Sequence, residues 1–106
     1  MIFRGAIYQN NALPSAAGHE QQSQRYAVVI QSDRFASRLT TVALTSTRAG
    51  EAIYRPEIEL AGTRTRILTD QIYSVADSRL GTFAGALEGR ELSDLDRVLL
   101  LKLGLV

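Results

Sequence analysis

Two continuous apolar runs rich in β-branched residues constrain this chain more than any other feature. They cover Tyr26 to Ile30 and Thr40 to Leu44, and a polar turn through residues 32–34 separates them. Runs of four to eight such residues, bounded by turn signals, are typical of strands that are buried on both faces. The sequence therefore predicts two core strands in the first half of the chain.

Further strand signals surround these two runs. Ile7 to Tyr8 has the composition of a short opening strand, and Ile53 to Leu60 alternates loosely between polar and apolar positions. Arg66 to Leu68 and Gln71 to Val75 continue the pattern. Short strands have to bury their apolar sides against one another, so about five of them predict a closed or nearly closed barrel.

The C-terminal segment changes to a helical period. Ser93 is a residue type that favours the N-cap, Asp94 and Asp96 follow it in the first turn, and Gly104 stands where a helix would end. We expect a helix from about Asp94 to Leu103, which makes the fold mainly β with a C-terminal helix. Its apolar residues cover more than one stripe, so we expect part of that surface to pack on a second subunit.

The bulk composition restricts the classes of function. With 106 residues, 45% hydrophobic and 22% charged, the chain is expected to form a single domain over 1–106. No apolar stretch approaches the roughly 20 residues that span a bilayer, and no signal peptide is recognisable, so we expect a cytoplasmic protein without a membrane partner. The absence of cysteine and the presence of one histidine argue against a metal site. A net charge of +1 argues against strong non-specific binding of duplex DNA, although not against nucleic acid in general.

A long polar loop from Asn10 to Gln24 is the first place to look for chemistry, because loops of this length in a compact domain are often functional. It contains the sole histidine, His19, beside Glu20. Histidine suits proton transfer near neutral pH, but an isolated loop histidine is also a common solvated surface residue. Arg25 ends the loop where a buried strand begins. It is either held at the rim of the barrel or paired with Glu20 at the surface.

Polar residues also stand at the ends of predicted strands. Thr45 and Ser46 close the second apolar run, where their hydroxyls either face a cleft shared with Arg25 or form a strand-ending turn. Asp70 and Gln71 lie between two strand-like segments, in a stretch that could equally be a plain turn. These patterns on their own lead to a small β-barrel with a polar loop and a C-terminal helix.

Five segments spread along the chain match a known family in composition and in order. They are Arg4 to Tyr8, Gly18 to Gln22 with Arg25, Thr41 to Ser46, Asp70 to Ile72, and Arg79 to Gly81. Each is weak alone, but the ordered set resembles the MazF/PemK/Kid toxins of bacterial toxin-antitoxin systems. The resemblance implies an SH3-like barrel that forms a homodimer, single-stranded RNA as substrate, a cognate antitoxin protein as partner, and endoribonuclease activity without metal or cofactor.

Carried over residue by residue, the resemblance implies that Arg25 and Thr45 are the catalytic pair. It also implies that the nearby polar residues take part in proton transfer or substrate binding: His19 and Glu20 in catalysis, and Gln21, Gln22, Ser46, Asp70 and Gln71 in binding. In the implied reaction the RNA 2'-hydroxyl attacks its own phosphorus and leaves a 2',3'-cyclic phosphate and a 5'-hydroxyl. Arg25 would stabilise the added charge and Thr45 would donate a further hydrogen bond, with Glu20 or His19 as the base.

Three positions depart from the family pattern, and two other functions remain open. Tyr26 replaces a proline, Ala6 an acidic residue and Tyr73 an arginine, so the RNA sequence preference of a relative is not transferable. The CcdB toxins resemble the same barrel but poison DNA gyrase by binding, without catalysis; the tryptophan expected near their C-terminus is absent here. A relative that has lost activity is a third possibility, against which Arg25 and Thr45 argue.

Overall fold

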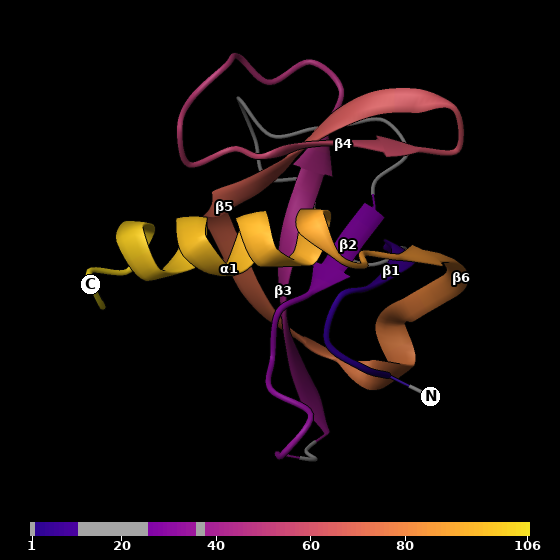
Figure 1. Ribbon diagram of the computed structural model, residues 1–106. Coiled ribbons are helices and arrows are strands. Elements are labelled where there is room, and N and C mark those ends of the chain that lie inside the picture. Colours follow the sequence, from indigo (N-terminus) through magenta and orange to yellow (C-terminus); the bar gives the residue numbers. More distant parts are fainter. Residues whose placement is uncertain (1, 11–25, 36–37) are drawn as a thin grey trace.

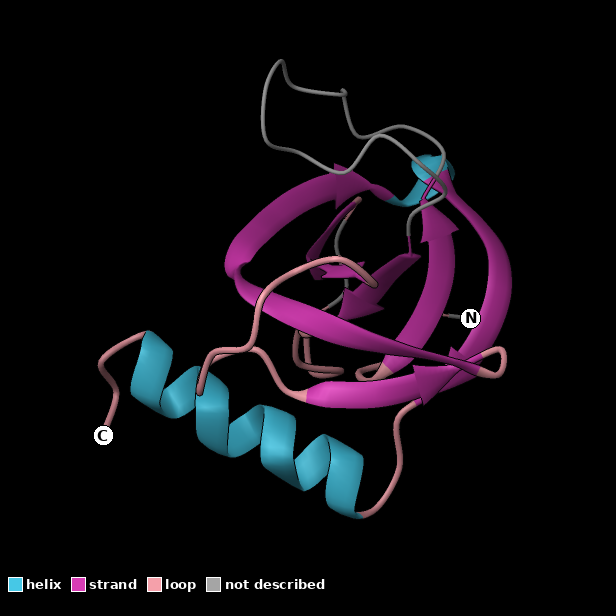
Figure 2. Ribbon diagram, turned by 90° about the horizontal axis from the view of Figure 1, so that it is seen from above, coloured by secondary structure: helices cyan, strands magenta, loops and turns pink. Residues whose placement is uncertain are grey.

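The computed structural model describes residues 2–10, 26–35 and 38–106. Within these ranges the chain forms six strands and one α-helix. Their bounds are β1 Ala6–Asn10, β2 Tyr26–Val29, β3 Leu39–Ser46, β4 Glu57–Leu60, β5 Thr63–Ala76, β6 Leu80–Ala86 and α1 Arg90–Lys102, with a 3-10 turn at Asp77–Arg79. The strands are antiparallel in the order β4-β5-β3-β2-β1-β6 and curl into a nearly closed barrel, with α1 along its outside (Figures 1 and 2). The predicted mainly β barrel with a C-terminal helix is confirmed.

The two central strands are buried on both faces, which explains their continuous apolar composition. On one face, Val28 and Ala43 belong to a cluster that includes Leu95 and Leu99 of the helix. On the other face, alternate residues of the same strands form a second cluster. It contains Ala6, Tyr8, Ala27, Val29, Val42, Leu44, Leu68 and Val75. Successive side chains of a strand point to opposite faces, so a strand between two apolar layers needs apolar residues at every position.

Helix α1 begins at Arg90, one turn before the predicted start at Asp94. Gly89 occupies the N-cap with φ 55°, and the amide of Ser93 donates to its carbonyl oxygen at 3.0 Å, so Ser93 lies inside the helix. The prediction of Ser93 as N-cap was wrong, because the helix begins one turn earlier, after a glycine in a positive-φ conformation that other residues rarely adopt. The predicted end is confirmed: Gly104 has φ 72°, and the amide of Leu105 donates to Leu100 at 2.8 Å, as in a Schellman motif.

An ion pair joins the start of the chain to the helix. The Arg4 guanidinium contacts the Asp96 carboxylate and donates from Nε to the carbonyl oxygen of Ile30 at 3.1 Å. Asp96, predicted as a residue of the first helical turn, therefore serves to hold α1 against the barrel. Of the residues that the structure describes, none form a helix with the length and hydrophobicity needed to cross a bilayer.

The second half of the sheet differs in detail from the predicted strands. Residues 51–56 form a loop instead of continuing β4, which is limited to Glu57–Leu60. The two segments predicted around residue 70 are one long strand, β5, with a bulge: Ala43 pairs with Ile72 and Leu44 with Leu68, which leaves residues 69–71 unpaired. Strand β6 was not predicted, because it is an exposed edge strand that contains two glycines.

Candidate functional site

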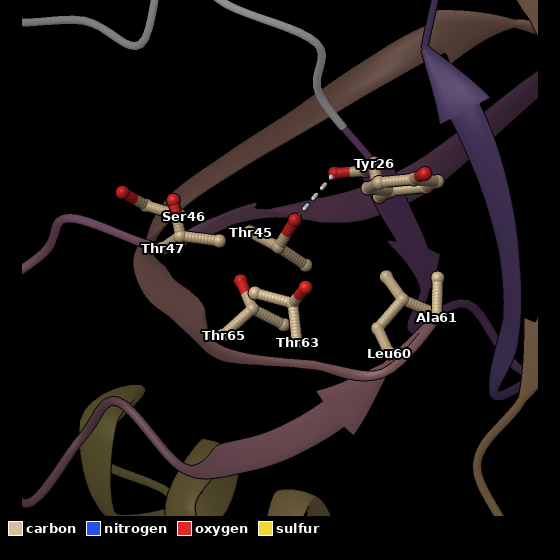
Figure 3. A pocket seen from close by; sticks show the side chains of 8 residues that line it. All are labelled: Tyr26, Thr45, Ser46, Thr47, Leu60, Ala61, Thr63 and Thr65. Atoms are coloured by element: carbon tan, nitrogen blue, oxygen red, sulfur yellow. Dashed lines mark hydrogen bonds between the residues drawn. The ribbon is translucent and has the colours of Figure 1, made fainter.

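A pocket of about 200 Å³ lies at one end of the barrel, where β2 begins, β3 ends and β4 turns into β5. Most of its lining side chains carry a hydroxyl group. The lining residues are Tyr26, Thr45, Ser46, Thr47, Leu60, Ala61, Thr63 and Thr65. Figure 3 shows the threonine hydroxyls at one side of the space and the Tyr26 ring with Leu60 and Ala61 at the other. The pocket therefore joins a polar wall to an apolar one.

The position of Thr45 follows from strand periodicity. It stands two residues after Ala43, on the face of β3 that packs toward α1, and its register partner on β5 is Ile67 of the same core cluster. Tyr26 and Thr65 stand two residues from Val28 and Ile67 in the same way. Side chains two residues apart lie on the same face of a strand. The face that is apolar in the core therefore carries Thr45, Tyr26 and Thr65 at this end of the barrel.

The Thr45 hydroxyl is buried but weakly bonded. Its side chain is 3% exposed, and its hydroxyl donates to the carbonyl oxygen of Tyr26 at 3.4 Å, near the limit for such a bond (Figure 3). A phosphate oxygen within reach of this hydroxyl would be a better acceptor, since hydrogen bonds to ionised groups are shorter and stronger. Thr45 is therefore able to exchange a weak internal bond for one to a ligand.

Ser46 has a structural role. Its hydroxyl oxygen accepts hydrogen bonds from the amides of Arg48 at 3.1 Å and Ala49 at 3.0 Å. This arrangement ends strand β3 in a tight turn, which is one of the two roles predicted for the Thr45 and Ser46 pair. The turn also fixes the backbone next to Thr45, and Ser46 still lines the pocket.

Asp70 lies on the bulge of β5 and is not among the residues that line the pocket. Arg55 donates two hydrogen bonds to its carboxylate, from Nε to Oδ1 at 3.2 Å and from Nη2 to Oδ2 at 2.9 Å. These hydrogen bonds lower the pKa of Asp70 below its ordinary value. The neighbouring Thr69 donates its hydroxyl to the carbonyl oxygen of Tyr54, so the bulge anchors the loop over residues 51–56 at two adjacent points.

The structure describes only one of the remaining predicted site residues, Gln71. His19, Glu20, Gln21, Gln22 and Arg25 lie outside the described residues. Gln71 is half-buried on the same bulge as Asp70 and does not line the pocket.

Of the residues that line the pocket, sequence reasoning predicted only Thr45 and Ser46 as site residues; the polar residues that it missed include Thr63 and Thr65. The signal was present in the sequence, since threonines at 63 and 65 alternate with arginines at 64 and 66 as strand period predicts, but the partner strand was not known. Within the described ranges, no three His, Cys, Asp or Glu side chains lie together in a way that could hold a metal ion.

The nearly closed barrel with its outer helix and hydroxyl-lined pocket defines a small β-barrel domain with one C-terminal helix. A family profile described as "PemK-like, MazF-like toxin of type II toxin-antitoxin system" matches residues 3–103. The chain belongs to this family. The CcdB alternative considered from the sequence is not favoured, because the match is to the PemK and MazF branch of these toxins over almost the whole chain.

Individual relatives agree with this assignment. The chain is 37% identical to endoribonuclease MazF9 of Mycobacterium tuberculosis over 119 aligned positions, 99% of this chain and 98% of the relative. It is 45% identical over 75 residues to Rv3098A of the same organism, named as a candidate toxin, with 71% of each chain covered. A mycobacterial endoribonuclease solved in complex with its cognate antitoxin has the same fold, with a TM-score of 0.80 at 13% identity over 100% of this chain and 98% of that one.

Proposed function

We propose that this toxin is an endoribonuclease that cleaves single-stranded RNA in the cytoplasm. The observation that carries the proposal is the pocket in which the Thr45 hydroxyl meets Tyr26, the residue that directly follows Arg25 in the chain. A hydroxyl donor and a guanidinium at one site are suited to a phosphodiester, because both can bond its non-bridging oxygens. Relatives named as endoribonucleases support the same activity.

The proposed reaction requires no group beyond side chains of the chain and the RNA itself. The 2'-hydroxyl oxygen attacks the adjacent phosphorus, the bond from phosphorus to the 5'-oxygen breaks, and the products are a 2',3'-cyclic phosphate and a 5'-hydroxyl. One proton leaves the 2'-oxygen and another reaches the departing 5'-oxygen. Arg25 stabilises the negative charge that develops on the phosphorane oxygens, and Thr45 donates a further hydrogen bond to them.

Proton transfer is assigned to the 10–24 loop. Glu20 or His19 takes the proton from the 2'-hydroxyl, since a carboxylate or a neutral imidazole has a lone pair that can accept a proton, whereas an arginine side chain stays protonated near neutral pH and is a poor base. Gln21, Gln22 and Gln71 are proposed to bind substrate. Ser46 and Asp70 contribute to binding through the backbone that they fix, next to Thr45 and in the loop over residues 51–56.

Two protein partners are proposed. The first is a second copy of the chain, because the end of α1 and the residues after it expose a run of apolar side chains. These are Leu100, Leu101, Leu103, Leu105 and Val106. The second is a cognate antitoxin, as the family description and the mycobacterial complex suggest. Homodimer formation would cover apolar surface that a single small barrel leaves in contact with water.

Cleavage of a long, end-labelled single-stranded RNA by the purified protein in excess EDTA tests the activity. We expect discrete fragments whose 3' ends are cyclic phosphates and whose 5' ends are free hydroxyls. The absence of cysteine and the single histidine in the sequence lead us to expect that EDTA leaves the rate unchanged. Loss of cleavage in EDTA, restored by magnesium, would show that the proposed mechanism is wrong; arrest of DNA gyrase without RNA cleavage would replace it by a binding function.

A further inference from the structure

The pocket beside Thr45 has one polar wall and one apolar wall, as a binding site for a nucleobase requires. One wall presents the hydroxyls of Thr63 and Thr65, which point toward Thr45, and the other presents the ring of Tyr26 above Leu60 (Figure 3). A nucleobase has the matching character: its faces are apolar and stack on aromatic rings, while its edges carry hydrogen-bond donors and acceptors.

We propose that this pocket holds one base of the RNA next to the bond that is cut. The Tyr26 ring packs on the face of the base, and the hydroxyls of Thr63 and Thr65 bond its edge. The inference rests on the proposed endoribonuclease function and assigns to the pocket the choice of nucleotide at one position. Tyr26, one of the three departures from the family pattern, thereby gains a role in specificity.

The charge of the pocket favours a base over a phosphate as its occupant. Among the described residues, none that lines the pocket is ionised at neutral pH. An ionised phosphate buried there without a cation would lose its hydration without compensation, whereas a neutral heterocycle loses much less. The phosphate is therefore expected at the mouth of the pocket, where Thr45 and the proposed Arg25 can reach it, and the adjoining base inside.

The size of the pocket and the state of its hydroxyls agree with this occupant. Its volume of about 200 Å³ lies below the roughly 300 Å³ at which pockets for drug-sized ligands begin, so it suits a single ring system. No hydrogen bond to another described residue engages the hydroxyl of Thr63 or Thr65, although Thr65 is 5% exposed. Thr63 is exposed and Thr65 is buried, and the hydroxyl of each can donate or accept toward a base edge.

The test compares the nucleotide preference of the parent with that of variants in which valine, which is similar in size but has no hydroxyl, replaces threonine. Thr63→Val, Thr65→Val and the double variant remove the hydroxyls, and Thr41→Val, on β3 but outside the pocket, is the matched control. Sequencing the 5'-hydroxyl ends released from a random RNA pool gives the preference at each position around the cut. We expect the double variant to lose about tenfold or more of its discrimination, at one position only, since each neutral hydrogen bond is worth a factor of about three to ten.

Tyr26 is tested by replacements that separate stacking from core packing. Tyr26→Phe keeps the ring, whereas Tyr26→Leu keeps the apolar contact with the core cluster and removes the aromatic face. Loss of one stacked base is expected to raise KM about tenfold in Tyr26→Leu, with kcat at saturation less affected, and Tyr26→Phe should match the parent. Thermal melting of each variant identifies any change that comes from unfolding.

The outcomes distinguish this inference from the proposed function. If the parent cuts RNA and the double threonine variant keeps the full preference of the parent at every position, the base site is wrong and the activity stands. If the parent cuts nothing, the proposed function fails. The base site is then judged by binding of 2'-deoxy oligonucleotides that differ in one base. Equal dissociation constants for the parent and the double variant across that set would overturn it.

Discussion

Arg55 and Asp70 form a bidentate ion pair, in which Arg55 donates from Nε to Oδ1 at 3.2 Å and from Nη2 to Oδ2 at 2.9 Å. A third bond, from Arg55 Nη1 to the carbonyl oxygen of Gly50 at 3.1 Å, extends the contact to the other end of the loop. The Lys102 ammonium lies 4.4 Å from the centre of the Tyr54 ring and brings the end of α1 to the same place. Asp70, predicted from the family resemblance to bind substrate, thus fixes the loop over residues 51–56 to the bulge, and Tyr54 of that loop contacts the end of the helix.

The Asp70→Asn variant should have a lower free energy of unfolding than the parent, and that free energy should depend less on pH in the acid range. The pKa of Asp70 is lowered in the folded protein, so its carboxylate adds stability above about pH 4, and that contribution is lost as pH falls through the folded pKa. We expect a loss of about 1 kcal/mol at neutral pH and a weaker decline below pH 4 than in the parent. Urea unfolding over that pH range measures both.

The control for this prediction is Asp94→Asn, which removes an exposed partner of Arg97 at 3.8 Å on the same helix as Lys102. Exposed pairs of this kind contribute little, so its unfolding free energy should stay close to that of the parent. A result in which Asp70→Asn and Asp94→Asn are equally stable would show that the Arg55 contact does not support the fold.

Ala61 offers a stabilising substitution at the edge of the pocket. It has φ 53° and precedes Gly62 at φ 78° in the two-residue turn between β4 and β5. Both central positions of such a hairpin turn need positive φ, which asparagine tolerates better than alanine. Ala61→Asn should raise the unfolding free energy by about 1 kcal/mol, whereas Gly62→Ala should lower it by a similar amount. Thermal melting that ranks the two variants in the opposite order would contradict this description of the turn.

The proposed catalytic pair predicts effects of different size. Arg25→Ala removes a charged, forked donor from the transition state, for which a loss of about a hundredfold to a thousandfold in rate is expected. Arg25→Lys should recover only part of this, because a point charge cannot make two parallel bonds. Thr45→Ala should cost less, since it removes one neutral hydroxyl, and Thr45→Ser should be nearly harmless.

Single-turnover cleavage of one labelled RNA, with all four variants shown to be folded by melting, measures these rates. Thr41→Val again provides a variant of the same strand that does not touch the pocket. A folded Arg25→Ala protein that cuts as fast as the parent would remove Arg25 from the active site.

The proposed homodimer predicts a mass of about twice 11.6 kDa at micromolar concentration in sedimentation. Leu101, 54% exposed near the end of α1, is the position to alter: Leu101→Gln should shift the equilibrium toward monomer. Leu39→Gln changes a side chain of nearly equal exposure, 53%, on the barrel away from the helix, and should leave the mass unchanged. A parent that sediments as a monomer at that concentration would exclude the dimer.

The sequence by itself determined the parts of this protein that depend on local periodicity. Continuous apolar runs predicted β2 and β3, because the side chains on both faces of these strands pack in apolar clusters. Gly104 predicted the end of α1, because a positive φ at the residue after the C-cap favours glycine over other residues. The ordered segments, from Arg4 to Gly81, were sufficient to indicate the family to which the chain belongs.

Only the tertiary structure decided how distant segments meet. The bulge at residues 69–71 appeared in the sequence as a break between two strands, since a local pattern does not reveal that the partner strand continues past it. The same holds for the pocket: the threonines at 45 and 65 lie 20 residues apart and share a face because β3 and β5 pair in one particular register. A shift of one residue would turn every side chain to the opposite face, so the pairing determines which hydroxyls line the site.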